Sequence, residues 1–176
     1  MGSPETATRS TEETARTYFD AVSRRDVDGM AACWAPDGVD HLYGMADLEG
    51  PDGVKEWFAT MFTAAPDFTF EVTDIVTEGD RSVVRWRAKG TFDGEGKFEG
   101  LLPMGATLDL EGIDMLTVKD GLLTENRAYT NGMEMARQMG VMPPAGSIAE
   151  RGMLGTANLK TRVAGLLKRR RAGEPA

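Results

Sequence analysis

Residue types that define several functional classes are scarce in this sequence of 176 residues. There is a single cysteine, Cys33, which cannot form a disulfide within the chain and gives no cysteine pair with metal-ligand spacing. Its place beside Trp34 favours a packing role over a nucleophilic one. We therefore expect neither a disulfide framework nor a bound metal.

Positive charge and long apolar runs are also lacking. The formal net charge is −8, which argues against a nucleic-acid partner because phosphate contacts need a basic surface. No apolar run approaches the roughly 20 residues of a membrane span. The opening "MGSPETATRS" has no apolar core of a signal peptide. We expect a protein without a membrane span, in a reducing, cytoplasmic setting.

The charge that is present is unevenly distributed. Residues 1–150 carry 13 Lys and Arg against 27 Asp and Glu, whereas residues 151–176 carry seven basic residues and one acidic residue. The basic end, "LLKRRRAGEPA", is interpreted as a solvated tail or one that rests on the acidic part of the chain. The alternative is contact with an anionic membrane or RNA.

Helical periodicity is concentrated in the first third of the chain. Residues 1–9 are polar and predicted to be disordered. "STEETARTYFDAVSRRD" predicts an amphipathic helix capped by Ser10 or Thr11, with Tyr18 on its inner face. "DVDGMAACWAPDG" predicts a second, short helix that Pro36 and Gly38 end. After an extended piece, "VDHLYG", the segment "GPDGVKEWFATMFTAAPD" predicts a third helix.

Strand patterns follow. "FTFEVTDIVTEG", "RSVVRWRAKGTF", "ATLDLEGIDMLTV" and "LLTENRAYTN" alternate as strands, and "KDG" predicts a hairpin turn between the last two. A short helix, "GMEMARQMGVMPP", and an amphipathic helix over 148–169 complete the chain. Helices followed by strands indicate an α+β fold. We expect a curved antiparallel sheet wrapped around the three N-terminal helices as a cone over 10–144, with a cavity at its open end, and a C-terminal helical extension with a basic tail over 145–176.

These elements resemble a known family. "YFDAVSRRDVDGM", "WAPDGVDH", "EGDRSVVRWRAKGTFDG", "GIDMLTVKDGLL" and "RQMGVMPP", in this order, are similar to the SnoaL-like polyketide cyclase branch of the nuclear transport factor two-like superfamily, over about residues 14–144. The resemblance implies the fold more strongly than the function, since this scaffold hosts isomerases, cyclases, hydrolases, dehydratases and binding proteins. We expect a homodimer, which is compatible with each of these functions.

The resemblance also implies roles for particular residues. Ketosteroid isomerase uses a Tyr and a protonated Asp as oxyanion donors and a second Asp as base; the matching positions are Tyr18, Asp114 and either Asp40 or His41. The polyketide cyclases place an acid–base Asp where this chain has Asn131. Limonene epoxide hydrolase needs an Arg where this chain has Gly112, which argues against that chemistry.

Asp114 is the principal candidate from the residues themselves. It falls on the apolar face of "LEGIDMLTV", between Gly112 and Leu116. Desolvation should raise its pKa, and a neutral acid there could donate a hydrogen bond to a developing enolate oxygen. Such a donor typically contributes about 3–4 kcal/mol of barrier lowering. The alternative is a structural ion pair between Asp114 and Arg127.

The remaining candidates each have a plain alternative. Tyr18 is a second oxyanion donor or a buried aromatic residue. His41 is the only histidine and a possible base near neutral pH, but strand alternation lets only one of Asp40 and His41 point inward. Asn131 holds a substrate carbonyl or caps the following helix. Arg127 binds a substrate carboxylate or pairs with Glu125 or Asp114.

The aromatic residues suggest what the site would hold. The large side chains expected in the core and in the cavity wall are Trp34, Trp57, Phe58, Phe62 and Trp86. Such a wall suits a flat, apolar compound.

The Gly-rich "GTFDGEGKFEG" does not open a helix after a strand, so no nucleotide site is expected. The sequence thus predicts a cofactor-independent enzyme that forms an enolate of a hydrophobic carbonyl compound. The alternative is a binding protein without chemistry.

Overall fold

The computed structural model describes residues 9–172. The predicted disordered segment 1–9 lies outside this range except for Arg9. The described chain divides into two compact units that meet between Met135 and Ala136. The first unit contains every strand and the three N-terminal helices. The second unit contains the whole of helix α5 (Ile148–Ala172), which Ser147 caps by accepting a hydrogen bond from the Glu150 amide at 3.1 Å.

The elements of the first unit follow the order α1, α2, β1, β2, α3, β3, β4, β5, β6, α4. The helices are α1 (Thr11–Arg24), α2 (Val27–Ala31), α3 (Gly50–Ala64) and α4 (Gly132–Gln138), the last of which runs into the second unit. The strands are β1 (Trp34–Leu42), β2 (Ala46–Glu49), β3 (Thr69–Glu78), β4 (Arg81–Phe92), β5 (Ala106–Lys119) and β6 (Leu122–Thr130).

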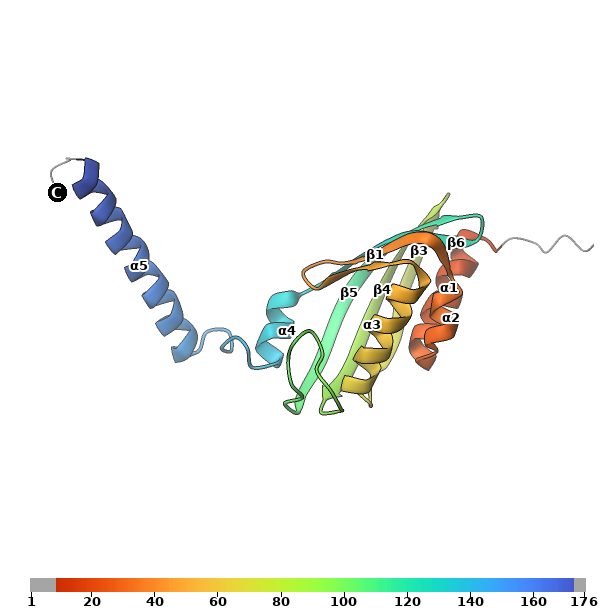
Figure 1. The fold of residues 1–176 in the computed structure, drawn as a ribbon, viewed down its shortest axis with the longest axis horizontal. Helices are drawn as coiled ribbons and strands as arrows, with labels where there is room; N and C mark the ends of the chain where they lie inside the picture. The colour runs from red at the N-terminus through yellow and green to blue at the C-terminus, as the bar shows by residue number, and fades with distance from the viewer. Residues whose placement is uncertain (1–8, 173–176) are drawn as a thin grey trace, which may run out of the picture. The chain divides into compact units, whose positions relative to one another are not determined.

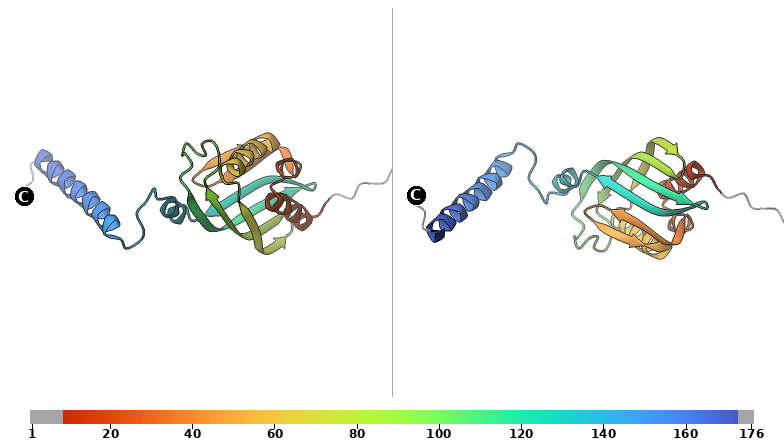
Figure 2. Two further views of the ribbon diagram at one scale, coloured as in Figure 1. Left: turned by 90° about the horizontal axis from the view of Figure 1, so that it is seen from below. Right: turned by 90° about the horizontal axis from the view of Figure 1, so that it is seen from above.

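The six strands form one curved, open sheet in the order β2-β1-β6-β5-β4-β3, and the first three helices lie on its inner side (Figures 1 and 2). The α+β prediction is confirmed. The expectation of a fully antiparallel sheet is wrong, because β1 pairs with β6 in parallel. This parallel pair is possible because helix α3 and four further strands separate β1 from β6 in the chain, which gives enough length for a crossover.

The structure differs from the sequence prediction at two places between the first and third helices. The second helix ends at Ala31, well before Pro36, and β1 already begins at Trp34. Strand β2 was not predicted; its four residues pair with the far half of β1. Proline is tolerated in β1 because the pairing with β6 has a register shift between Trp34 and Val39, around Pro36.

Apolar side chains of the helices fill the space under the sheet. Helix α1 begins with a capping box between Ser10 and Glu13 and buries Tyr18 and Phe19. Phe19 stacks on Phe70 of β3 with the ring centroids 5.5 Å apart. Helix α3 buries Phe58 and Phe62 in the same core. The inner face of the sheet therefore packs against this core, and a candidate site on that face lies beside the core residues.

Candidate active site

Three polar side chains meet on the inner face, where three adjacent strands lie side by side. Asp40 comes from β1, Asn126 from β6 and Asp114 from β5. Asn126 Nδ2 donates to Asp40 Oδ1 at 2.9 Å and to Asp114 Oδ2 at 2.8 Å. The opposite orientation of the amide would point its oxygen at two carboxyl groups, so the donating orientation is the favourable one. We call Asp40, Asn126 and Asp114 the carboxyl cluster.

Two aromatic side chains complete the surroundings of the cluster. Trp86 of β4 donates from Nε1 to Asp114 Oδ1 at 2.7 Å. The Tyr18 hydroxyl of α1 is a longer contact, 3.4 Å from Asp40 Oδ2. The indole N–H of Trp34 lies beside that hydroxyl and favours its ionised form, but the contact falls short of hydrogen-bond geometry. Five elements thus converge on two carboxyl groups.

Burial shifts the pKa of both carboxyl groups in the same direction. Desolvation raises the pKa of Asp40 to about 8, and the nearby Asp114 carboxylate adds to the rise. Desolvation also raises the pKa of Asp114, but only to about 6, because the N–H groups of Trp86 and Asn126 stabilise its charge. Burial, followed by the charges of Asp40 and Asp114, raises the pKa of Tyr18. Near pH 7 the pair therefore holds one proton, mainly on Asp40.

The two acids differ slightly in burial. Asp40 is fully buried, whereas Asp114 retains 6% exposure. Along the inward positions of β5, side chains are buried from Val118 to Gly112 and only half-buried at Leu110 and Leu108. Asp114 lies next to this change. The more accessible end of the inner face therefore begins on the Gly112 side of Asp114.

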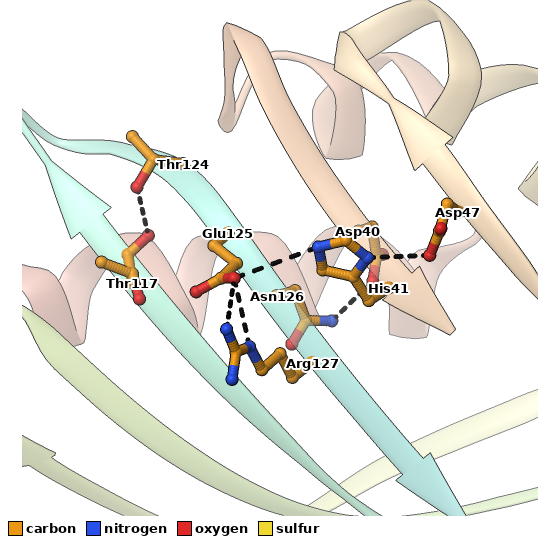
Figure 3. A network of polar contacts seen from close by, with 8 residues as sticks. All are labelled: Asp40, His41, Asp47, Thr117, Thr124, Glu125, Asn126 and Arg127. Atoms are coloured by element: carbon orange, nitrogen blue, oxygen red, sulfur yellow. Dashed lines mark hydrogen bonds and ion pairs between the residues drawn. The ribbon is translucent and has the colours of Figure 1, made fainter. Parts of the chain in front are cut away.

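Other predicted site residues lie away from the cluster. His41 follows Asp40 in β1 and points to the outer face, where its Nδ1 is 2.8 Å from Asp47 Oδ1 and its Nε2 is 4.0 Å from Glu125 Oε1 (Figure 3). Arg127 also lies on the outer face, with Nη2 2.9 Å from Glu125 Oε1 (Figure 3). The alternative in which Arg127 pairs with Asp114 is therefore wrong, since strand alternation places the two side chains on opposite faces.

Asn131 occupies a structural position. Its Oδ1 accepts a hydrogen bond from the Glu134 amide at 3.1 Å, and its carbonyl accepts from the Met135 amide, so it caps α4. Its exposed side chain does not reach the carboxyl cluster.

The aromatic candidates divide between core and surface contacts. Trp34, Phe58 and Phe62 are buried in the core. Trp57 is half-buried and donates its indole N–H to Glu99 Oε1 at 2.8 Å, while its ring meets the Phe98 ring edge-on. Trp86 is the member of this set that contacts the cluster.

The sequence interpretation overlooked Asn126, which joins the two acids. A signal was present, because Asn126 alternates with Ala128 and Thr130 on the inward face of β6. Its Oδ1 is buried and makes no hydrogen bond within the described residues. In residues 9–172, no group of three or more His, Cys, Asp or Glu side chains is placed to hold a metal ion. Within the same range, no helix is long and apolar enough to cross a membrane.

Comparisons with known proteins agree with this architecture. A solved SnoaL-like candidate polyketide cyclase from Jannaschia sp. CCS1 superposes with a TM-score of 0.67 at 24% identity, covering 81% of this chain and all of the other. AclR, a candidate hydroxylase from Streptomyces galilaeus, gives 0.64 at 23% identity over 90% and 97% of the two chains. IdmH, a candidate polyketide cyclase from Streptomyces antibioticus, gives 0.61 at 26% identity over 75% and 99%.

A search of curated proteins found no significant match to this sequence. The family model described as SnoaL-like polyketide cyclase matches residues 12–139, which include every strand of the sheet and the whole carboxyl cluster. The chain therefore belongs to the SnoaL-like polyketide cyclase family.

Proposed function

We propose that the protein catalyses proton transfer beside the carbonyl group of a small hydrophobic compound, leading to isomerisation or intramolecular aldol cyclisation. The observation that supports this proposal is the carboxyl cluster, in which Asn126 joins Asp40 and Asp114 on a mostly apolar inner face. Two acids whose surroundings separate their pKa values provide a proton acceptor and a proton donor at one pH.

Asp114 is assigned as the group that moves the proton. It is the more accessible acid of the pair, and it lies beside the half-buried end of the inner face. With a pKa raised to about 6, it is mostly ionised near pH 7 and more basic than an ordinary aspartate. This assignment differs from the sequence-based one, in which Asp114 remained neutral and donated to the enolate oxygen. Asp40, which is mainly neutral near pH 7, is not exposed to a ligand.

The reaction balances without an added reagent. Asp114 takes the proton from the carbon next to the carbonyl, and the C–H electron pair becomes the enolate. In an isomerisation, Asp114 returns the proton to another carbon of the conjugated system. In a cyclisation, the enolate carbon forms a C–C bond to a second carbonyl carbon, and that carbonyl oxygen takes the proton from Asp114. Neither outcome changes the overall oxidation level of the substrate.

Asp40 and Tyr18 support this group from behind. Neutral Asp40 allows the cluster to carry a single negative charge, since two adjacent buried carboxylates would repel each other. The Tyr18 hydroxyl contacts Asp40 rather than the accessible end of the inner face. We therefore assign Tyr18 to holding Asp40 in place, not to contact with the substrate.

A binding protein without chemistry is the second candidate. Both oxygens of Asp114 already accept hydrogen bonds, and Asp40 and Asn126 are fully buried. Such a network can have a purely structural role, in which it fixes the packing of a core. On this hypothesis, the inner face would hold an apolar ligand without exchanging its protons.

Hydrogen–deuterium exchange separates the two candidates. The protein is incubated in deuterated water with an unsaturated ketosteroid or a polyketide-like β-ketoester, and exchange at the α-carbon is followed by NMR. We expect Asp114→Asn to slow exchange about 10²- to 10⁴-fold. The matched control is Glu111→Gln, on the outer face of the same strand, where Glu111 pairs with Arg85 at 3.0 Å; it should exchange at the wild-type rate.

Two results would count against catalysis. Tight binding of an enolate-like phenol with no exchange by the wild type would support the binding protein. Equal exchange by the wild type and Asp114→Asn would show that another group moves the proton.

A further inference from the structure

Trp86 reaches the carboxyl cluster across a neighbouring strand. Its backbone is paired with Gly112 in the β4–β5 register, and its indole Nε1 donates to Asp114, two residues farther along β5. On its other side the indole packs against the Phe70 ring, with the centroids 5.2 Å apart. The indole is thus held between an aromatic ring and the backbone of β5.

Gly112 is what allows this position. A Cβ atom at residue 112 would lie 2.2 Å from Cζ2 of Trp86 and 2.6 Å from two further indole carbons. Real Cβ atoms do not approach other heavy atoms this closely, so any side chain at residue 112 would displace the indole. The glycine on the inward face of β5 therefore has a specific steric purpose.

We propose that Trp86, placed over Gly112, is the positioning residue that makes Asp114 rather than Asp40 the ionised member of the pair. The geometry is asymmetric: Asp114 accepts from two N–H donors at 2.7 and 2.8 Å. An indole N–H can only donate, so it stabilises the anion and cannot stabilise a proton placed on the same oxygen.

The other groups that face the pair do not offset this asymmetry. Asn126, from β6, donates to both acids at nearly equal distances. Tyr18, from α1, contacts only Asp40, at 3.4 Å, which is a weak hydrogen bond. Trp86 is therefore the group that distinguishes Asp114 from Asp40. The catalytic meaning of this difference depends on the proposed function, but the difference itself does not.

The test is a carboxyl titration by ¹³C NMR on ligand-free protein, comparing wild type with Trp86→Phe. Phenylalanine keeps a ring beside Phe70 but removes the N–H. We expect the pKa of Asp114 to rise by about one unit, a tenfold change in proton affinity, and that of Asp40 to fall as its neighbour loses charge. Trp57→Phe is the matched control, because it removes an indole N–H that bonds Glu99 instead; both titrations should stay at wild-type values.

A second variant tests the role of the glycine. Gly112→Ala should displace the indole and reproduce the Trp86→Phe titration, whereas Gly132→Ala, where a Cβ would meet nothing within 4 Å, should not. The Trp86 indole N–H resonance in wild type should also shift with the ionisation of Asp114. The proposal is overturned if Trp86→Phe leaves both carboxyl titrations unchanged, or if that resonance is independent of pH between 5 and 8.

The titration and the exchange assay can fail separately. Carboxyl groups that titrate as expected, in a protein that exchanges no substrate proton, would retain the positioning role and reject the proposed function. Exchange that depends on Asp114, with titrations unaffected by Trp86→Phe, would retain the function and reject the positioning role.

Discussion

Asp40 and Asp114 accept hydrogen bonds from the same nitrogen atom, Nδ2 of Asn126, at 2.9 and 2.8 Å. The two acids come from β1 and β5, which do not pair with each other but both pair with β6. One of these pairings is parallel and the other antiparallel. The mixed sheet therefore brings two carboxyl groups to one amide.

The cluster should make the protein less stable as pH rises. Both acids have a higher pKa in the folded state than the ordinary value of 3.8, so the folded protein binds more protons than the unfolded chain. Their contribution to the free energy of unfolding therefore decreases from about pH 4 upward. The part due to Asp114 is lost by about pH 6 and that due to Asp40 by about pH 8.

We expect Asp40→Asn to remove the larger part of this dependence. Urea denaturation at pH 5 and pH 8 measures it, and the wild type should lose on the order of a few kcal/mol more than the variant between these values. Asp37→Asn, at an exposed position of the same strand, should behave as wild type. If the wild type and Asp40→Asn lose the same free energy of unfolding between pH 5 and pH 8, Asp40 is not buried as a neutral acid.

Asn126 should be important for stability in a pH-dependent way. Asn126→Leu preserves the volume of the side chain but leaves two buried carboxyl groups without their shared donor. We expect the free energy of unfolding at pH 8 to fall by about 1–3 kcal/mol, because a buried charged acceptor loses a hydrogen bond. At pH 5, where both acids are neutral, the loss should be smaller.

Asn131→Leu is the comparison for Asn126→Leu. It removes a helix cap from an exposed position, which typically costs about 1 kcal/mol. Its cost should be the same at pH 5 and pH 8, since Asn131 contacts neither acid. If the two variants have the same pH dependence, Asn126 does not stabilise the charge of the cluster.

Most of the regular elements and the inward position of Asp114 could be predicted because they depend on local patterns. Alternation along "LEGIDMLTV" places Asp114 with Leu116 and Val118, and all three are buried. The capping box at Ser10 and the Asp120–Gly121 turn, with φ of +50° and +75°, are also local. These features need only the neighbouring residues of the chain.

The partners of Asp114 could not be predicted in the same way. Asn126 meets Asp40 only because β1 and β6 pair in parallel, and that pairing joins segments 86 residues apart. Whether Asp40 or His41 points inward depends on the register of β1, and this register shifts between Trp34 and Val39. The Trp86 contact depends on the absence of a side chain at Gly112, and no periodic pattern indicates it.

Residues of the outer face should have little effect on the chemistry. His41 contacts Asp47 and Glu125 on the side of the sheet opposite to Asp114. We expect His41→Ala to leave the deuterium exchange rate within about twofold of wild type and to reduce stability by no more than about 1 kcal/mol, as is usual for exposed ion pairs. A loss of exchange comparable to that in Asp114→Asn would restore His41 as the base.

The charge of the cluster should also select among ligands. Near pH 7 it carries one negative charge, and within residues 9–172 no Lys or Arg forms an ion pair with Asp40 or Asp114. Two like charges about 4 Å apart repel by about 4 kcal/mol at an effective dielectric constant of 20. We expect the methyl ester of an aromatic keto acid to bind at least tenfold more tightly than the free acid, measured by calorimetry at pH 7.5. Asp114→Asn should reduce this preference, because it removes the charge but keeps the shape. A free acid that binds as tightly as its ester to the wild type would show that the bound ligand does not approach Asp114.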